Sequence, residues 1–135
     1  MKALRVLLAA GAALCLAPAA QAQTAKAVLK DQAGKEVGTV QLSETPHGVL
    51  LKLALKGAVP GVHAFHIHAV GKCEAPFTSA GGHFNPEKKQ HGVMNPQGHH
   101  AGDLPNIAVN AKGKATWKGL VKGVTLADGP ANSLF

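Results

Sequence analysis

Residues 49–56 read Val-Leu-Leu-Lys-Leu-Ala-Leu-Lys, and this stretch decides the fold class. Its apolar side chains occupy every second position: Val49, Leu51, Leu53 and Leu55. Lys52 and Lys56 stand in the alternate positions. Because successive side chains of a β-strand point to opposite faces, this period of two predicts a strand with one buried face and one solvated face.

The flanking sequence repeats the same alternation from residue 25 onward, as where Val40 and Leu42 alternate with Thr39 and Gln41. Segments rich in turn-forming residues separate the alternating runs, at 31–35, 59–61 and 110–114. The last of these turns joins a run at 107–109 to one at 115–121. Six such runs without sustained helical periodicity predict an all-β antiparallel sandwich or barrel.

The alternation stops between residues 69 and 105, where Gly, Pro, Asn and His predominate. This segment is far longer than the usual connections of compact domains. It is not disordered in composition, because it carries Phe77, Phe84, Val93 and Met94. We therefore expect a bound metal or a disulfide to hold the loop in place.

The first 22 residues have the three-part layout of a secretory signal peptide. Lys2 and Arg5 precede an apolar run at 6–16, and the small-residue sequence Ala-Gln-Ala follows at 20–22. The apolar run is shorter than the ~20 residues that a membrane-spanning helix needs. We expect a signal peptide over 1–22 and one exported domain over 23–135, without a membrane anchor.

Acylation of Cys15 is an alternative fate for the N-terminus. Leu14 precedes this cysteine where a lipidation signal needs a small residue, so cleavage after residue 22 is the favoured interpretation. Cleavage would leave Cys73 as the only cysteine, an odd count for an exported protein.

Charge and aromatic content argue against nucleic acid as a partner. Without the first 22 residues the net charge falls from +7 to +5, with twelve Lys, no Arg and seven acidic residues. The lysines are scattered along the sequence, and four Phe, one Trp and no Tyr offer little for base stacking. The composition favours a solvated surface with some attraction for small anions.

Histidine is concentrated in one part of the chain, since seven of the eight histidines lie within residues 63–100. Alternation in the strand-like run at 63–68 puts His66 and His68 on one face, roughly 6 to 7 Å apart at Cα, so that one metal ion could join them. Phe65 and Ile67 would share the opposite face with His63. We therefore expect His63 to be a core residue and not a ligand.

The loop offers a second donor set of three imidazoles and one carboxylate: His83, His91, His100 and Asp103. These donors satisfy tetrahedral zinc with no open position, which is typical of a structural site. Donor type alone leaves the metal at His66 and His68 open between copper and zinc. Three glycines are expected to let the loop backbone approach the metals: Gly81, Gly82 and Gly102.

Three motifs carry a family resemblance: HAFHIHAVGKCE at 63–74, SAGGHFNPEKKQHG at 79–92 and NPQGHHAGDLPNI at 95–107. In order and spacing they resemble the copper/zinc superoxide dismutases, and the likeness extends over residues 25–135. The resemblance implies a Greek-key β-barrel of the bacterial, periplasmic type. It also implies copper and zinc as cofactors and superoxide anion as the substrate, with dioxygen and hydrogen peroxide as products.

The resemblance assigns a role to each motif residue. The copper ligands and catalytic residues would be His66, His68 and His83. The zinc ligands would be His83, His91, His100 and Asp103. His83 would thus bridge the two metals as an imidazolate, while His47 lies outside the motifs and His99 stands beside His100 as a competing donor.

The family pattern continues past Phe135, with a strand that bears a fourth copper-ligand histidine, a catalytic arginine and a second cysteine. We therefore expect the last two strands to be missing and the dismutase activity to be impaired. Cys73 matches the first disulfide cysteine of the family and would lack its partner. Formation of a homodimer, supported by Cys73 pairing between chains, would cover the exposed strand edge.

Three alternatives to an active dismutase stay open. One is an exported copper/zinc-binding protein without enzymatic activity, and another is a truncated product that does not fold stably. The third is a zinc hydrolase, which the donor set allows but which lacks an evident general base near His66 and His68.

Overall fold

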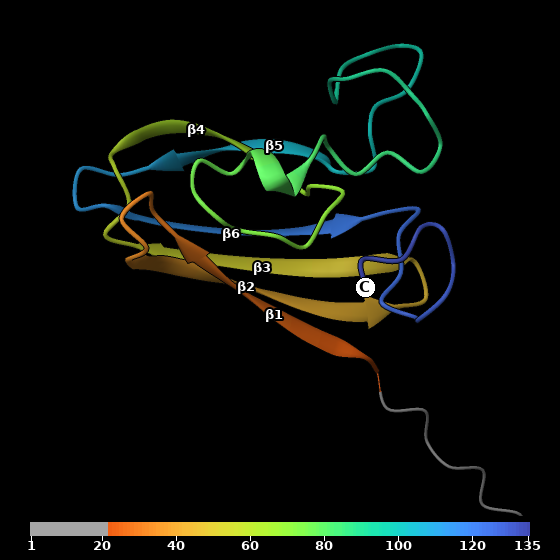
Figure 1. Ribbon diagram of the computed structural model, residues 1–135, viewed down its shortest axis with the longest axis horizontal. Helices are drawn as coiled ribbons and strands as arrows, with labels where there is room; N and C mark the ends of the chain where they lie inside the picture. The colour runs from red at the N-terminus through yellow and green to blue at the C-terminus, as the bar shows by residue number, and fades with distance from the viewer. Residues whose placement is uncertain (1–21) are drawn as a thin grey trace, which may run out of the picture.

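Two antiparallel sheets form residues 22–135, the part of the chain that the computed structural model describes (Figure 1). The larger sheet has the strand order β1-β2-β3-β6, and the smaller sheet pairs β4 with β5. The strands are Thr24–Lys30 (β1), Glu36–Thr45 (β2), Gly48–Lys56 (β3), Gly61–His66 (β4), Asp103–Val109 (β5) and Lys114–Val121 (β6). A short 3-10 turn, Thr78–Ala80 (η1), interrupts the long loop. The predicted all-β sandwich is confirmed.

The predicted signal peptide lies outside the described residues except for Ala22. Among residues 22–135, no helix has the length and apolar character needed to cross a membrane.

Strand β3 supplies the centre of the core. Val49, Leu51 and Leu53 are almost fully buried, whereas Lys52 and Lys56 are exposed, as the alternation predicts. β3 pairs with β2 on one side and with β6 on the other. Burial of one such aliphatic side chain contributes about 1.5 to 3 kcal/mol relative to exposure, so this strand is a main source of the stability of the larger sheet.

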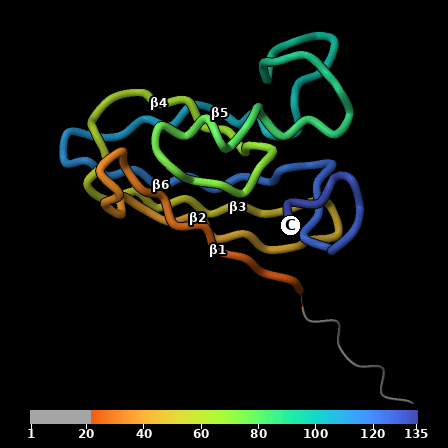
Figure 2. Tube along the Cα trace, in the orientation of Figure 1, coloured from red at the N-terminus to blue at the C-terminus, as the bar shows by residue number. Residues whose placement is uncertain are grey.

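After β3 the chain crosses to the smaller sheet and forms β4 and β5. It then returns to the larger sheet, where β6 pairs with β3 (Figure 2). Two side chains of β5, Leu104 and Ile107, pack in one core cluster with the larger sheet, and Val109 is also buried. Phe65 of β4 and Trp117 of β6 pack edge to face, with ring centroids 5.7 Å apart. Such aromatic pairs add about 0.5 to 1.5 kcal/mol beyond their buried area, and this pair joins the two sheets.

Strands β4 and β5 differ from the sequence-based expectations in two ways. β5 begins at Asp103, within the segment predicted to be loop. His63, predicted to lie in the core, is exposed and its Nε2 lies 2.7 Å from the Val59 carbonyl oxygen. The physical reason is an irregular register between His63 and Phe65, which breaks the alternation on which that prediction depended.

A small set of backbone hydrogen bonds fixes both ends of the long loop to each other. The Ile67 N–H donates to the Gly102 carbonyl, the Gly102 N–H donates to the Phe84 carbonyl, and the Phe84 N–H donates to the Ile67 carbonyl, at 2.8 to 2.9 Å. Segments that lie far apart in the sequence therefore meet at three residues. This junction sits next to the histidines of the motifs.

Two of the three loop glycines occupy positions that favour glycine. A Cβ on Gly102 would overlap the Ile67 carbonyl oxygen, so the close approach requires glycine. Gly81 has a φ of +69°, a left-handed conformation that favours glycine. A Cβ at Gly82 would meet no protein atom within 4 Å, so the expectation for this residue stays a prediction.

We expect Gly102→Ala to lower the free energy of unfolding by about 1 to 3 kcal/mol, because the added methyl group must displace the Ile67 backbone. Urea denaturation of residues 23–135 measures this loss. Gly71→Ala is the matched control, since a Cβ at Gly71 enters open space. Equal stability of the two variants would contradict the close packing of the junction.

Candidate metal centre

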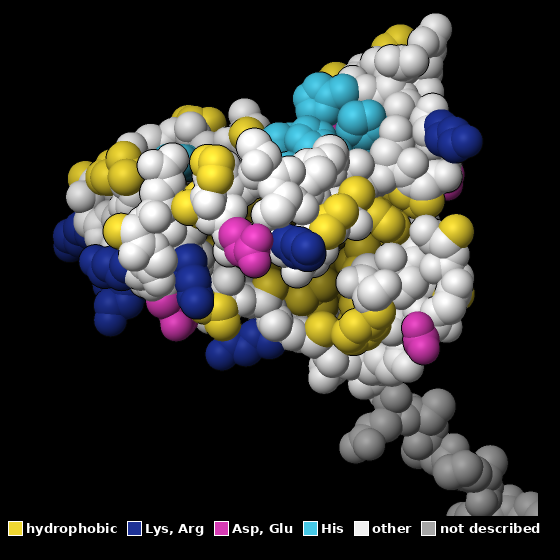
Figure 3. Space-filling view, in the orientation of Figure 1, with side chains coloured by type: hydrophobic (Ala, Val, Ile, Leu, Met, Phe, Trp, Pro, Cys, Tyr) yellow, Lys and Arg dark blue, Asp and Glu magenta, His cyan; other side chains and the backbone are white. Residues whose placement is uncertain are grey.

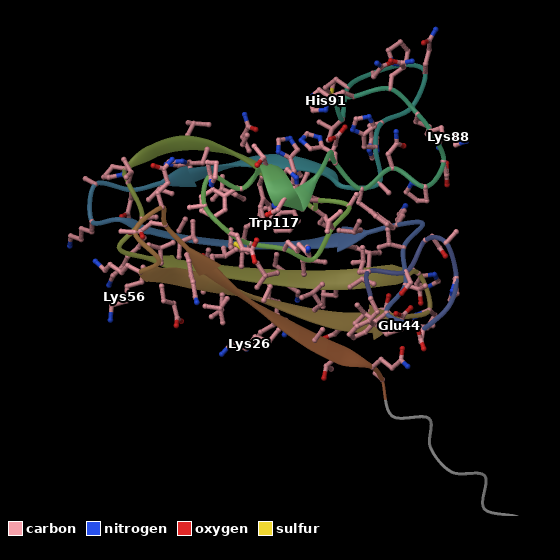
Figure 4. The ribbon with its side chains drawn as sticks, in the orientation of Figure 1. Lys26, Glu44, Lys56, Lys88, His91 and Trp117 are labelled. Atoms are coloured by element: carbon pink, nitrogen blue, oxygen red, sulfur yellow. The ribbon has the colours of Figure 1, made fainter. Side chains whose placement is uncertain are left out.

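The motif histidines gather at one end of the smaller sheet. His66 ends β4, Asp103 begins β5, and the loop between them brings His83, His91 and His100 to the same place. Figure 3 shows a cluster of histidine side chains on the surface, and Figure 4 shows His91 at its outer margin. Residues from four separate segments thus share one site.

The Asp103 side chain is the hub of this cluster, and it is only 2% exposed. Its Oδ1 lies 2.8 Å from Nδ1 of His83, 3.1 Å from Nδ1 of His91 and 3.4 Å from Nδ1 of His100. Its Oδ2 accepts hydrogen bonds from the Gly92 N–H at 2.8 Å and the His100 N–H at 3.2 Å. Every loop segment of the site therefore contacts one carboxylate.

Burial by itself would raise the pKa of the Asp103 carboxyl group. The hydrogen bonds from the Gly92 N–H, the His83 ring and the His100 N–H favour the charged form and outweigh that effect. The net result is a pKa well below the ordinary value for aspartate. Asp103 is therefore a carboxylate at neutral pH, the form that binds metal ions.

The distances among these four groups fit a tetrahedral zinc ion. With Zn–N bonds of about 2.0 to 2.1 Å, the ligand atoms of a tetrahedron lie roughly 3.3 Å apart. The three Nδ1 atoms lie 2.8 to 3.4 Å from Asp103 Oδ1, and Nδ1 of His83 lies 3.5 Å from Nδ1 of His100. Three imidazole nitrogens and one carboxylate oxygen converge at this point. A cation bound among them would have all four atoms as ligands.

A second group of imidazoles adjoins the first through His83. The His66 and His83 rings stack with centroids 3.9 Å apart and an interplanar angle of 20°. His68 lies on another side of His83, at a ring-centroid distance of 5.4 Å and nearly perpendicular to it. Potential ligand atoms of four residues lie within 4.8 Å of one another: His66, His83, His91 and Asp103.

Two features prepare this second group for metal binding. Burial, followed by the neighbouring His83, lowers the pKa of His66 and favours the neutral imidazole, which is the ligand form. His68 Nδ1 lies 2.9 Å from the Gly81 carbonyl oxygen. If that nitrogen carries the proton, Nε2 of His68 is free to bind a metal.

All six motif residues lie in one cluster, and three other histidines lie outside it. His47 stands in the turn after β2, His63 contacts Val59, and Nδ1 of His99 lies 2.7 Å from the His100 carbonyl oxygen. The sequence did not indicate the backbone donors and acceptors of Gly92 and Gly81, because backbone groups carry no residue-specific signal.

Cys73 is exposed and forms no disulfide with another described residue. It lies at the margin of a groove of about 510 Å³ between the two sheets, lined mainly by apolar side chains of β1 to β4. His66 and His68 of the histidine cluster form part of its wall.

The fold and the cluster together define a β-sandwich protein with a candidate metal site made of histidine and aspartate side chains. The model of the family described as copper/zinc superoxide dismutase matches residues 36–134. The chain belongs to this family.

Relatives from bacteria agree with this assignment. Superoxide dismutase [Cu-Zn] 1 of Aquifex aeolicus is 48% identical over 118 residues, covering 86% of this chain and 70% of that protein. Superoxide dismutase [Cu-Zn] 2 of the same organism is 47% identical over 137 residues, covering 100% and 80% of the two chains. The crystal structure of a SOD-like protein from Bacillus subtilis has a TM-score of 0.75 at 35% identity, covering 82% of this chain and 75% of that chain.

We expect Asp103→Asn to lower zinc affinity by at least about 100-fold, because the substitution removes the charge that three imidazoles share. Competition with a chromophoric chelator measures the affinity. Asp128→Asn, which removes an exposed carboxylate, is the control. Unchanged zinc affinity in Asp103→Asn would rule out the carboxylate as the hub of the site.

Proposed function

We propose that this chain is a superoxide dismutase in which His66, His68 and His83 hold copper and His83, His91, His100 and Asp103 hold zinc. One observation carries the proposal. His83 presents Nδ1 to Asp103 at 2.8 Å while its ring stacks on His66 at 3.9 Å. This single imidazole thus belongs to both donor groups.

Two bound metals would contribute different chemistry. Copper supplies one-electron oxidation and reduction, so that two superoxide ions and two protons become one dioxygen and one hydrogen peroxide. Zinc has no redox chemistry and would order the loop. The donor sets agree with this division, because the Asp103 group is a closed four-ligand set and the His66 group consists of imidazoles alone.

His83 can serve both metals because an imidazole has two ring nitrogens. Nδ1 faces Asp103, which leaves Nε2 free for a second metal. Loss of both ring protons would make His83 a bridging imidazolate. The contact between His68 Nδ1 and the Gly81 carbonyl would hold the His68 ring and direct its Nε2 to the same metal.

The site is open to a small anion. His68 is exposed, His66 is half-buried, and the His91 side chain is 61% exposed. The net charge of the exported part, +5, favours the approach of an anionic substrate over that of a cation. We further propose that residues 1–22 direct export to the periplasm, as the charged, apolar and small-residue segments of the N-terminus suggest.

The copper side offers three imidazoles from residues 22–135, whereas the zinc side has four ligands. Cupric copper prefers a larger tetragonal set of ligands, and water would have to complete it. We therefore infer reduced turnover for residues 23–135 compared with longer relatives. The same asymmetry supports the second candidate function, an exported metal-binding protein that retains zinc without dismutation.

We expect His66→Ala to abolish superoxide dismutation while leaving bound zinc unchanged, because His66 stacks on His83 and is not one of the four proposed zinc ligands. His100→Ala should lose zinc by contrast, since its Nδ1 faces Asp103 at 3.4 Å. Metal content per chain and superoxide dismutation are measured together on residues 23–135 loaded with copper and zinc.

His47→Ala, outside the cluster, is the control and should match the parent chain in both measurements. The parent chain should show lower turnover per bound copper than the longer Aquifex aeolicus relative. Equal loss of zinc in His66→Ala and His100→Ala would contradict the division into two groups. Full zinc binding without any dismutation in the parent chain would favour the metal-binding protein.

A further inference from the structure

The outer face of the larger sheet, turned away from the smaller sheet, carries half of the lysines in residues 23–135. We call it the lysine face, and its six members are Lys26 and Lys30 of β1, Lys52 and Lys56 of β3, and Lys114 and Lys118 of β6. All six are exposed. Figure 4 shows Lys26 and Lys56 pointing away from β4 and β5, and Figure 3 shows several basic side chains along that margin.

The strand register places four of these lysines in direct opposition. Lys52 is paired with Lys118, and Lys56 is paired with Lys114. Directly opposed side chains on neighbouring strands have Cβ atoms about 4.5 to 5.5 Å apart, and like charges at such positions destabilise a sheet. Lys26 extends the first row, because Gln41 separates it from Lys52. The repulsion between these opposed lysines therefore lowers the stability of the folded sheet.

Carboxylates do not balance this charge. Glu36 pairs with Lys30 at the end of β1, and the Asp31 carboxylate accepts N–H groups of its own turn. Within residues 22–135, the ion pair of Glu87 with Lys89 is the one that joins a lysine to a carboxylate. The four lysines of β3 and β6 thus face one another without counter-charges.

Protection of a sheet edge explains only part of the pattern. Lysines on edge strands such as β1 and β6 discourage pairing with other chains. Lys52 and Lys56, however, lie on β3, which is hydrogen-bonded on both sides. Solvation would be served equally by charges of both signs, so the opposed pairs indicate a surface that meets negative charge.

The shape of the lysine face selects the kind of partner. Lysines four residues apart on a strand lie roughly 13 Å apart, so the two pairs form an array of about 5 by 13 Å, with Lys26 roughly 10 Å beyond it. No aromatic side chain is on the outward positions of β1, β3 and β6, which argues against stacking on nucleic-acid bases. Two partly exposed apolar side chains, Val28 and Leu120, lie on the same face.

We propose that the lysine face binds the surface of a bilayer that contains anionic phospholipid. Mobile headgroups can neutralise each lysine of a broad sheet face, and shallow apolar side chains suit the headgroup region. The metal centre lies beyond β4 and β5, on the other side of the molecule, and stays open to solvent in this orientation (Figure 1). The enzyme would then work next to a membrane without being anchored in it.

Vesicle co-sedimentation tests the proposal. Residues 23–135, which contain every described strand, are mixed at low salt with phosphatidylcholine vesicles holding 0 or 40% phosphatidylglycerol. We expect binding only to the anionic vesicles and its loss at high salt. The double variant Lys52→Gln with Lys118→Gln should bind at least about tenfold more weakly, since each lysine near an anionic surface contributes roughly fivefold.

The double variant Lys72→Gln with Lys88→Gln removes the same charge from two loop positions and is the matched control. Its binding should stay within about twofold of the parent chain. Thermal unfolding should show that Lys52→Gln with Lys118→Gln is as stable as the parent chain or more stable, because opposed charges are removed.

Three outcomes would overturn the proposal. Equal weakening by both double variants would show that only net charge matters. Equal binding to vesicles without phosphatidylglycerol would exclude recognition of anionic headgroups. Displacement of the protein from anionic vesicles by a smaller concentration of duplex DNA phosphate than of lipid phosphate would assign the lysine face to nucleic acid.

Discussion

The carboxylate of Asp103 connects the long loop to the sheets. Asp103 is the first residue of β5. Its carboxylate contacts three imidazole rings and two backbone N–H groups that come from separate parts of the loop. A buried carboxylate without such partners would cost several kcal/mol, so the fold requires these groups to converge. A metal ion that binds the same groups would add its binding energy to the ordering of the loop.

The strands and the site differ in how directly the sequence predicts them. Alternating apolar residues such as Val49 and Leu51 identify strands because burial follows the period of two. The same rule wrongly predicted that His63 is buried. The register of β4 is irregular between His63 and Phe65, and a single sequence does not show where such an irregularity lies. The junction of Ile67, Phe84 and Gly102 consists of backbone bonds between distant segments, so only Gly102 could be suspected beforehand.

The six motif residues were predicted as a set because imidazole and carboxylate side chains recur at family spacing, and all six lie in one cluster. Their division between two metals depends on His83, which is common to both groups. The lysine face, by contrast, could not be predicted from the sequence. Its lysines look scattered in the sequence, and only the pairing of β3 with β6 brings them into opposition.

The most direct test is anomalous diffraction at the copper and zinc absorption edges from crystals of residues 23–135 loaded with both metals. The account predicts two separate peaks, one among His83, His91, His100 and Asp103 that is strong at the zinc edge, and one among His66, His68 and His83 that is strong at the copper edge. A single peak, with only one ring nitrogen of His83 bound to metal, would contradict it.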